Sequence, residues 1–463
     1  MVNQQFSKSI ATLPLLILFV LGTLLAIATE LPYGGWIQIP LLSILWWRLD
    51  SFSTPSIKKQ FALGLIFGIG YFVVGLWWLY ISLHDVGGMN ALLACMGVFL
   101  LSAYVAIYFS IATLAIPLFK KNRFTGLFLA ASWVVAEFLR GYIFTGFPWM
   151  GFAETQFTGP FALIAPFFGG LTCTFLVVWA SWELYQARKH PTSSVLLIVA
   201  AISLTQFAGL FTFTKPIGEL ISVRLIQGNF EQSLKFNPQA IGQQIDFYAG
   251  EITKQAANLI IIPETAFPWP IPNLPIGLLN YLQDFSNGSN SNVLLGLIGE
   301  VPGEIGVQYS NRATGLSPNA PAYQYDKAHL VPFGEFIPPG FQWFVKAFHV
   351  PMSDFARGKL DQPPFAIVRK GQADIHAAIT ICYEDVFGGE LASRIRTSSQ
   401  PVNLLVNMTN LAWFGDSQAP EQQLRLSQLR SLETGLPALR ATNTGITAVL
   451  GHDGKVLAML PKF

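Results

Sequence analysis

Three side chains with complementary chemistry follow apolar runs in the second half of the chain. Glu264 ends the run LIIIPE, Cys382 follows the run IHAAITI, and Lys327 lies in YDKAHLVPFGEFIP. A cysteine nucleophile needs a base to take its proton and a positive group to hold negative charge. No histidine is obviously placed to take the proton of this cysteine, so Glu264 is the candidate base. The residue types alone also allow a buried core cysteine and a snorkelling surface lysine.

The elements that carry these residues are short and apolar, as buried strands are. The strand-length runs are ISVRLIQG, NLIIIPE, NVLLGLIGE, IHAAITICYE, NLLVNMTN and GITAVLG. Helix-like stretches at 238–257 and 421–436 lie between them. Strands that alternate with helices predict an α/β layered domain. Polar residues end several runs, and sites in α/β sheets gather beyond the carboxyl ends of strands. The residues at these run ends are Gln227, Asn229, Glu264, Cys382, Glu384, Asn407 and Asn410.

The first half of the chain has a different composition. Residues 1–219 hold 18 charged residues and residues 220–463 hold 36. The whole chain is 52% hydrophobic and only 12% charged, which excludes a disordered chain, a coiled coil and a plain cytosolic enzyme. The net charge of +2 provides no strong field for nucleic acid. We therefore expect a polytopic transmembrane domain at 1–219 and a catalytic domain at 220–463.

Apolar stretches long enough to cross a membrane predict about seven transmembrane helices. They are 11–29, 32–47, 60–82, 90–118, 124–143, 160–186 and 193–213. Glu137 and Glu183 fall near the ends of two stretches, where an interfacial role is the expected one.

Loop charges predict the orientation, because cytoplasmic loops are rich in Lys and Arg. Nine positive residues lie at alternate ends of the stretches, whereas the opposite loops hold Arg140 and little else. The bias places the N-terminus in the cytoplasm, and seven spans then place everything after residue 215 on the outer face. The positive residues are Lys8, Arg48, Lys58, Lys59, Lys120, Lys121, Arg123, Arg188 and Lys189.

The motifs around the three reactive residues resemble a known superfamily. IIPETAFPWP, YDKAHLVPFGEFIP and ICYED, in this order and spacing, are similar to the Glu-Lys-Cys triad of the nitrilase superfamily. This resemblance implies an α-β-β-α sandwich. A nitrilase-like domain behind a polytopic membrane domain resembles the apolipoprotein N-acyltransferase family. Supporting stretches are GFPWMGFAETQ, QGNFEQSLKF, VNMTNLAWFGDS and LRATNTGITAV.

The resemblance implies a role for each matching position. Glu264 would accept protons, Lys327 would stabilise the oxyanion, and Cys382 would be the nucleophile. The supporting residues would be Glu335, Tyr383 and Glu384, and the substrate-binding residues would be Phe236, Asn410 and Trp413. Two positions depart from the family pattern, because Phe236 stands where Trp is common and Leu411 replaces an acid. Members usually continue into an eighth span, so the domain at 220–463 is expected to be C-terminally shortened.

The implied reaction is a two-step acyl transfer through a cysteine thioester. A phospholipid, phosphatidylethanolamine by expectation, donates its sn-1 acyl chain. The acceptor is the N-terminal amino group of the S-diacylglyceryl-cysteine of an apolipoprotein. This is the last step of bacterial lipoprotein maturation. The resemblance implies a monomer in the inner (cytoplasmic) membrane with a periplasmic catalytic domain and no nucleic-acid partner. The six histidines show no metal-ligand spacing, so no metal or other cofactor is expected.

Other functions share some of these features. A membrane-tethered nitrilase-type amidase would use water as the acceptor, but it gives the membrane half no chemical role. A transporter or sensor with an inactive enzyme-like domain would not need Cys382. A purely structural membrane protein would not explain the polar residues at the strand ends.

Overall fold

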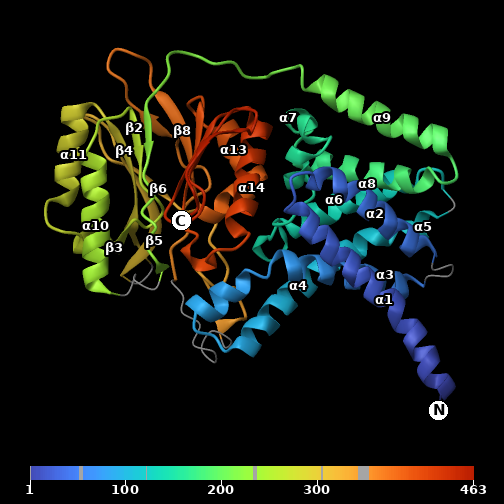
Figure 1. Cartoon of the computed structure of the whole chain (residues 1–463). Coiled ribbons are helices and arrows are strands. Elements are labelled where there is room, and N and C mark those ends of the chain that lie inside the picture. The colour runs from blue at the N-terminus through green and yellow to red at the C-terminus, as the bar shows by residue number, and fades with distance from the viewer. Residues whose placement is uncertain (1, 52–55, 121, 233–236, 304–305, 343–353) are drawn as a thin grey trace. The chain divides into compact units, whose positions relative to one another are not determined.

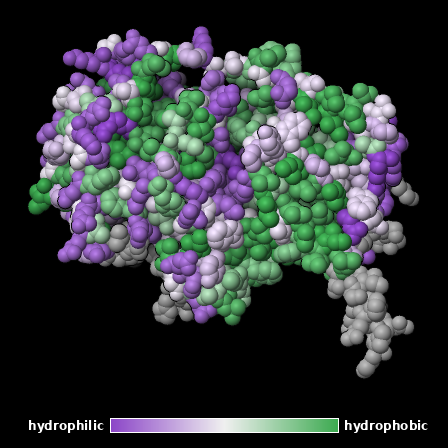
Figure 2. Space-filling view, in the orientation of Figure 1, coloured by the Kyte–Doolittle hydropathy of each residue, from purple (hydrophilic) through white to green (hydrophobic). Residues whose placement is uncertain are grey.

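The computed structural model divides the chain into two compact units. It describes residues 2–51, 56–120, 122–232, 237–303, 306–342 and 354–463. Unit 1 comprises Met1–His84 and Asn90–Phe213, and unit 2 comprises Asp85–Met89 and Thr214–Phe463 (Figure 1). In the space-filling view, hydrophobic residues dominate the surface of the helical unit, whereas hydrophilic residues are frequent on unit 2 (Figure 2).

Unit 1 is helical, and a helix lies in each of the seven ranges expected from the sequence. Three of the described helical segments are long and apolar enough to cross a membrane: Ile57–Gly75, Ala91–Phe119 and Pro191–Ala208. The number of seven spans therefore stays a prediction. The α-helices are α1 (Val2–Thr29), α2 (Gly34–Ser51), α3 (Ile57–Gly75), α4 (Ala91–Thr113), α5 (Ala115–Phe119), α6 (Thr125–Arg140), α7 (Ala165–Phe168), α8 (Gly170–Gln186) and α9 (Pro191–Ala208).

Glycines bring the first helices of unit 1 into close contact. A Cβ on Gly70 of α3 would lie 2.2 Å from the backbone oxygen of Phe19 in α1, and one on Gly22 would lie 2.1 Å from that of Phe67. A Cβ on Gly68 would lie 2.7 Å from Ala106 in α4. Small residues allow helix backbones to approach closely in membranes, where van der Waals packing drives association.

An irregular segment that follows α6, at residues 146–151, is held by buried polar side chains. Arg140 is 1% exposed and donates to the backbone carbonyls of Phe147 and Trp149. Glu137 is 6% exposed and accepts a hydrogen bond from Thr174 at 2.9 Å. Glu137 is therefore buried within the helical unit, and its expected position at the membrane interface stays a prediction. Irregular backbone in an apolar environment needs such internal partners.

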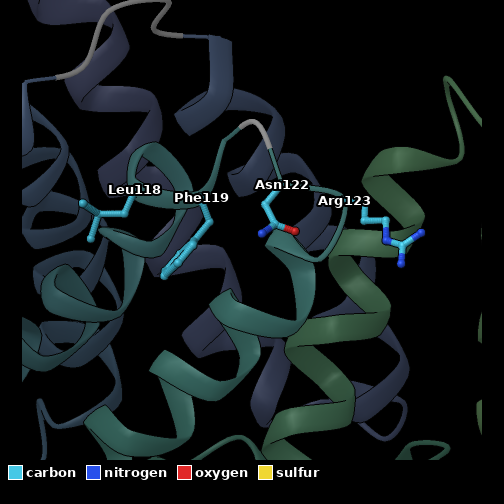
Figure 3. Close-up of a pocket in the computed structure, with 4 residues that line it drawn as sticks. All are labelled: Leu118, Phe119, Asn122 and Arg123. Carbon is cyan, nitrogen blue, oxygen red and sulfur yellow. The ribbon is translucent and has the colours of Figure 1, made fainter.

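Unit 1 also carries an open cavity of about 560 Å³. The end of α5 lines it with Leu118 and Phe119, and the loop that follows lines it with Asn122 and Arg123 (Figure 3). None of the candidate site residues lines this cavity.

Unit 2 contains two six-stranded sheets. The first has the order β1-β2-β4-β5-β6, with β3 paired to β4, and the second has the order β12-β11-β10-β9-β8-β7. The strands of the first sheet are β1 (Val223–Leu225), β2 (Leu259–Ile261), β3 (Phe267–Pro270), β4 (Asn292–Pro302), β5 (Val307–Leu316) and β6 (Tyr323–Asp326). Those of the second are β7 (Phe365–Ile367), β8 (Ile375–Ile381), β9 (Leu404–Thr409), β10 (Ala438–Thr442), β11 (Ala448–Leu450) and β12 (Val456–Met459).

The sheets pack face to face between two layers of helices (Figure 1). One apolar cluster joins Leu259 and Ile261 of the first sheet to Ile379 and Val406 of the second. A second cluster packs the other face of the first sheet on α10 (Pro238–Thr253) and α11 (Leu278–Ser289). A third packs the other face of the second sheet on α13 (Gly388–Thr397) and α14 (Ala419–Thr434). The result is an α-β-β-α sandwich.

The LIII run shows how the sequence specifies this arrangement. Leu259 and Ile261 face the second sheet, whereas Ile260 and Ile262 face the helices. Successive side chains of a strand point to opposite faces, so a strand covered on both faces is apolar throughout.

The glycine contacts of unit 1 predict a stability difference between two substitutions in detergent. Gly70→Ala should lower the free energy of unfolding by about 1–3 kcal/mol, because the new methyl group overlaps the α1 backbone. The matched control is Gly97→Ala in α4, whose Cβ would meet only the Leu83 side chain at 3.3 Å. Thermal unfolding of both variants provides the measurement. Equal melting temperatures would contradict the close packing of α1 on α3.

Candidate active site

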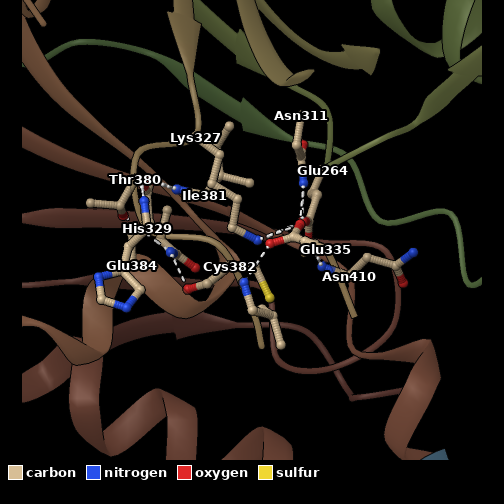
Figure 4. A network of polar contacts seen from close by, with 12 residues as sticks. Glu264, Asn311, Lys327, His329, Glu335, Thr380, Ile381, Cys382, Glu384 and Asn410 are labelled. Atoms are coloured by element: carbon tan, nitrogen blue, oxygen red, sulfur yellow. Dashed lines mark hydrogen bonds and ion pairs between the residues drawn. The ribbon is translucent and has the colours of Figure 1, made fainter. Parts of the chain in front are cut away.

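The three reactive residues meet at the carboxyl edges of the two sheets. Strands β2 and β6 run in the same direction in the first sheet, because β2 is parallel to β4 and two antiparallel pairings separate β4 from β6. Glu264 and Lys327 follow these strands and therefore lie at one edge. Cys382 follows β8 of the facing sheet. Figure 4 shows the three side chains directed toward one another within a single polar network.

Glu264 is fixed by donors on three sides. Its Oε1 accepts from Asn311 Nδ2 at 2.7 Å and from Lys327 Nζ at 3.4 Å. Its Oε2 accepts from the backbone N–H of Asn410 at 2.9 Å. The residue is 7% exposed, so the carboxylate is shielded from bulk water. A carboxylate held in this way can exchange a proton with a group that arrives in a defined direction.

Lys327 is fully buried and binds a second carboxylate more closely than the first. Its Nζ lies 2.8 Å from Glu335 Oε1, and the lysine side chain is 1% exposed. Burial by itself would lower the pKa of Lys327, but the carboxylates of Glu335 and Glu264 raise it above its ordinary value. Glu335 Oε2 also accepts from the N–H of Val331, which closes the PFGEF turn on itself. The lysine is therefore a permanent positive charge beside the thiol.

The backbone at Cys382 is strained. Its φ is +50°, in the left-handed region that residues other than glycine rarely adopt. Thr265 and Phe333, next to the other reactive segments, also have positive φ of 47° and 62°. The carbonyl of Cys382 accepts from Gln423 Nε2 at 2.9 Å and from Asn407 Nδ2 at 3.2 Å, which holds this conformation. Strain that the surroundings impose is typical of residues presented for chemistry.

The thiol of Cys382 is neutral at ordinary pH. Burial and the nearby Glu264 carboxylate raise its pKa to about 12, although Lys327 acts in the opposite direction. A neutral thiol reacts as a nucleophile only when a base takes its proton. Glu264 is a carboxylate beside Cys382.

Glu384 binds the turn Cys382–Val386, here called the cysteine turn, to residues 327–329, here called the lysine loop. Its carboxylate accepts from the N–H groups of Ile381, Ala328 and His329 at 2.7, 2.6 and 3.0 Å. The hydroxyl of Tyr325 adds a bond of 2.9 Å. Burial raises the pKa of Glu384, which Arg394 partly offsets. This residue therefore positions the two reactive segments relative to each other and does not face the reacting atoms.

An ion pair lies below the cysteine turn. Arg440 donates to Asp385 at 2.9 Å, and their side chains are 0% and 4% exposed. Arg440 also donates to Asn407 Oδ1, and Gln423 contacts Asp385, so the same network reaches the Cys382 carbonyl. Removing one partner of a buried ion pair typically lowers the stability of a protein by about 3–5 kcal/mol. We therefore expect this network to stabilise the cysteine turn.

The remaining predicted residues have different positions. Tyr383 is 7% exposed and packs edge-on against Phe387, with ring centroids 5.0 Å apart. Asn410 contacts Glu264 through its backbone and Gln232 through its side chain. Trp413 lies half-buried in the turn Ala412–Phe414. Phe236 lies outside the described residues.

The sequence did not indicate several residues of this network. Asn311 joins Glu264 to Glu335, Tyr325 binds Glu384, and Gln423 binds the Cys382 carbonyl. Tyr325 stands two residues before Lys327, so the lysine motif contained a signal for it. Asn311 and Gln423 lie in segments without a recognisable motif, and only the pairing of strands and helices brings them to the site.

The comparisons with known proteins identify the family. Residues 21–182 match the model of the apolipoprotein N-acyltransferase N-terminal domain, and residues 222–463 match the carbon-nitrogen hydrolase model. An apolipoprotein N-acyltransferase of Ralstonia nicotianae is 39% identical over 438 residues, which cover 90% of this chain and 82% of that protein. The chain belongs to the apolipoprotein N-acyltransferase family.

The comparisons also include a second curated relative and a solved structure. The apolipoprotein N-acyltransferase of Nitrosomonas europaea is 38% identical, over 92% of this chain and 84% of that protein. A solved CN-hydrolase superfamily protein of Xanthomonas campestris is 16% identical, with a TM-score of 0.38, over 53% of this chain and 88% of that one. The family membership and the carbon-nitrogen hydrolase match confirm the resemblance seen in the motifs and the nitrilase-like fold of unit 2.

The charges around Cys382 predict opposite effects of two substitutions on thiol alkylation. Glu264→Gln removes a negative neighbour and leaves Lys327, so the apparent pKa for alkylation should fall below the wild-type value of about 12. Lys327→Met removes the positive neighbour and should slow alkylation at every pH tested. The measurement is the rate of iodoacetamide modification of Cys382, followed by intact mass from pH 7 to pH 10. Identical profiles in the three folded proteins would show that Cys382 does not sense these charges.

Proposed function

We propose that this chain is the apolipoprotein N-acyltransferase of its cell and works through a thioester on Cys382. Membership of the family confirms the function expected from the sequence, which is N-acylation of lipoproteins. The observation that carries the catalytic assignment is the convergence of Glu264, Lys327 and Cys382 at the carboxyl edges of the two facing sheets, with the cysteine in a strained turn.

In the first step the sulfur of Cys382 attacks the sn-1 ester carbonyl of a phospholipid, with phosphatidylethanolamine as the proposed donor. Glu264 takes the thiol proton as the C–S bond forms. The carbonyl oxygen becomes negative, and the ammonium of Lys327 stabilises it. Collapse breaks the C–O bond, and protonated Glu264 returns the proton to the departing alkoxide. The products are a lysophospholipid and an acyl thioester on Cys382.

In the second step the α-amino group of a diacylglyceryl-cysteine attacks the thioester. The amine arrives largely as an ammonium ion. Glu264 takes one proton from it and passes that proton to water, and it takes a second proton from the same nitrogen as the C–N bond forms. Lys327 again stabilises the oxyanion, and the C–S bond breaks as the amide forms. The cysteine sulfur leaves and regains its proton from Glu264. Neither step changes an oxidation state, and the thioester retains the reactivity of the donor ester. The proposed reaction therefore needs no cofactor.

The charge of the site supports a cationic acceptor. Lys327 offsets only one of the two buried carboxylates, Glu264 and Glu335. The cluster therefore has a formal charge of −1 while the thiol or thioester is neutral. An approaching ammonium ion is attracted to this charge and finds a base in contact distance.

We further propose that the protein is a multi-pass protein of the inner membrane with unit 2 on the periplasmic side. The family and the apolar helices support a membrane location, and the loop charges support the orientation.

The thioester route predicts a specific mass change. Wild-type protein incubated with phosphatidylethanolamine vesicles should gain the mass of one fatty acyl chain and release lysophospholipid. Cys382→Ala should show neither, whereas the matched control Cys95→Ala should behave like wild type, because Cys95 is exposed on α4. Intact-protein mass spectrometry measures the adduct, and hydroxylamine should remove it. An adduct that persists in Cys382→Ala would refute the assignment of the nucleophile.

The acceptor separates this function from the amidase alternative. A diacylglyceryl-cysteine peptide should remove the adduct and become N-acylated. Release of free fatty acid without an N-acylated peptide would instead favour water as the acceptor and overturn the transferase proposal.

The orientation is testable by labelling single cysteines in spheroplasts. Ile276→Cys places a thiol at a fully exposed position of unit 2 and should react with a membrane-impermeant maleimide. Lys58→Cys, exposed at the start of α3, should react only after the membrane is opened. The reverse pattern would contradict a periplasmic unit 2.

A further inference from the structure

The site contains two buried carboxylates but only one lysine in direct contact with both. The Oε1 atoms of Glu264 and Glu335 each lie near Lys327 Nζ, at 3.4 and 2.8 Å. Their side chains are 8% and 12% exposed, so water screens their repulsion weakly. Two such carboxylates repel each other unless a donor lies between them. Lys327 is one such donor, and a second donor in contact with both carboxylates would help to hold them in place.

Asn311 supplies this donor. Its Nδ2 donates to Glu264 Oε1 at 2.7 Å and to Glu335 Oε1 at 2.9 Å. Its backbone carbonyl accepts from the N–H of Lys327 at 2.9 Å. Asn311 therefore contacts both carboxylates and the backbone of the lysine. The side chain is buried, at 2% exposure.

The strand geometry directs Asn311 to the site. On either side of it in β5, Ser310 and Arg312 both bind Asp326 of β6. Alternate residues of a strand face opposite sides, so the Asn311 side chain points away from this ion pair. Its titratable neighbours are accordingly Glu264, Lys327, Glu335 and, beyond them, Cys382 (Figure 4).

The amide oxygen of Asn311 shows which contacts determine the orientation of the side chain. Asn311 Oδ1 is buried and finds no hydrogen-bond partner among the described residues. An unpaired buried carbonyl lowers stability. The two carboxylates therefore determine how the side chain lies, at some cost to the fold. A neutral amide also adds no charge, so the cluster keeps the negative charge that suits an ammonium acceptor.

We propose that Asn311 is a positioning residue for acyl transfer, which holds Glu264 and Glu335 together so that the Glu264 carboxylate stays available as the base. This inference rests on the proposed roles of Glu264 and Cys382. It assigns to Asn311 a contribution to the pH range in which the enzyme forms its thioester.

The test measures the rate of thioester formation against pH. Full-length protein in detergent reacts with p-nitrophenyl butyrate from pH 4 to pH 8, and quenched samples are read by intact mass. This ester acylates a reactive thiol without a phospholipid. The rate of thioester formation is expected to fall at acidic pH, and we call this part of the profile the acid limb. Asn311→Ala removes a donor to both carboxylates and should move the acid limb to a pH about one unit higher. Asn311→Asp adds a third carboxylate and should move it further.

The matched control is Asn292→Ala. Asn292 is a fully buried asparagine of β4 in the same sheet, and its side chain bonds to the backbones of Asn258 and Val368. This variant should lose stability but keep the wild-type acid limb. If Asn311 had only a structural role, its variants would behave in the same way. The rate of thioester formation would be lower, but the pH at which it falls on the acidic side would not change.

The outcomes distinguish this inference from the proposed function. Two results would overturn the role of Asn311. In the first, the rate of both variants falls at the same acidic pH as the wild-type rate, and in the second, the wild-type rate does not fall at acidic pH at all. Wild-type protein that reacts with the ester but gives no lysophospholipid from vesicles would overturn the phospholipid donor and leave the Asn311 result standing.

Discussion

The site depends on the compensation of two buried carboxylates by one buried lysine. A carboxylate or an ammonium ion removed from water loses several kcal/mol of hydration unless it finds partners. Lys327 supplies a charge to both Glu264 and Glu335, and Asn311 supplies a neutral donor to both. Much of the surrounding structure holds these four side chains in one geometry. Their separation determines whether Glu264 is a usable base.

The side chains of this cluster and Cys382 come from different elements of the fold. Glu264 follows a parallel strand buried on both faces, and Lys327 follows an edge strand of the same sheet. Glu335 comes from a turn closed by its own side chain. Cys382 comes from the opposite sheet, and Glu384 binds its turn to the lysine loop. The sandwich is therefore a means of bringing two strand edges together at a dry site, where electrostatic stabilisation is strongest.

Unit 1 meets the same physical requirement in an apolar setting. Its helices pack through glycines, and its irregular segment uses Arg140 to satisfy backbone carbonyls. In both units, buried polar side chains supply hydrogen-bond donors where the backbone leaves regular structure. In unit 2 such donors hold the carbonyl of Cys382, whereas in unit 1 they hold a loop.

The sequence by itself determined the class of the protein, the helical and α/β halves, and the identity of the candidate triad. These features depend on composition, on periodic apolar runs and on local motifs, which are readable along the chain. The tertiary structure alone decided the positions of Asn311 and Gln423 and the burial of Glu137. It also decided that Lys327 lies closer to Glu335 than to Glu264. These features arise from strand register and helix packing between segments far apart in sequence, where one amide looks like any other until its neighbours are known.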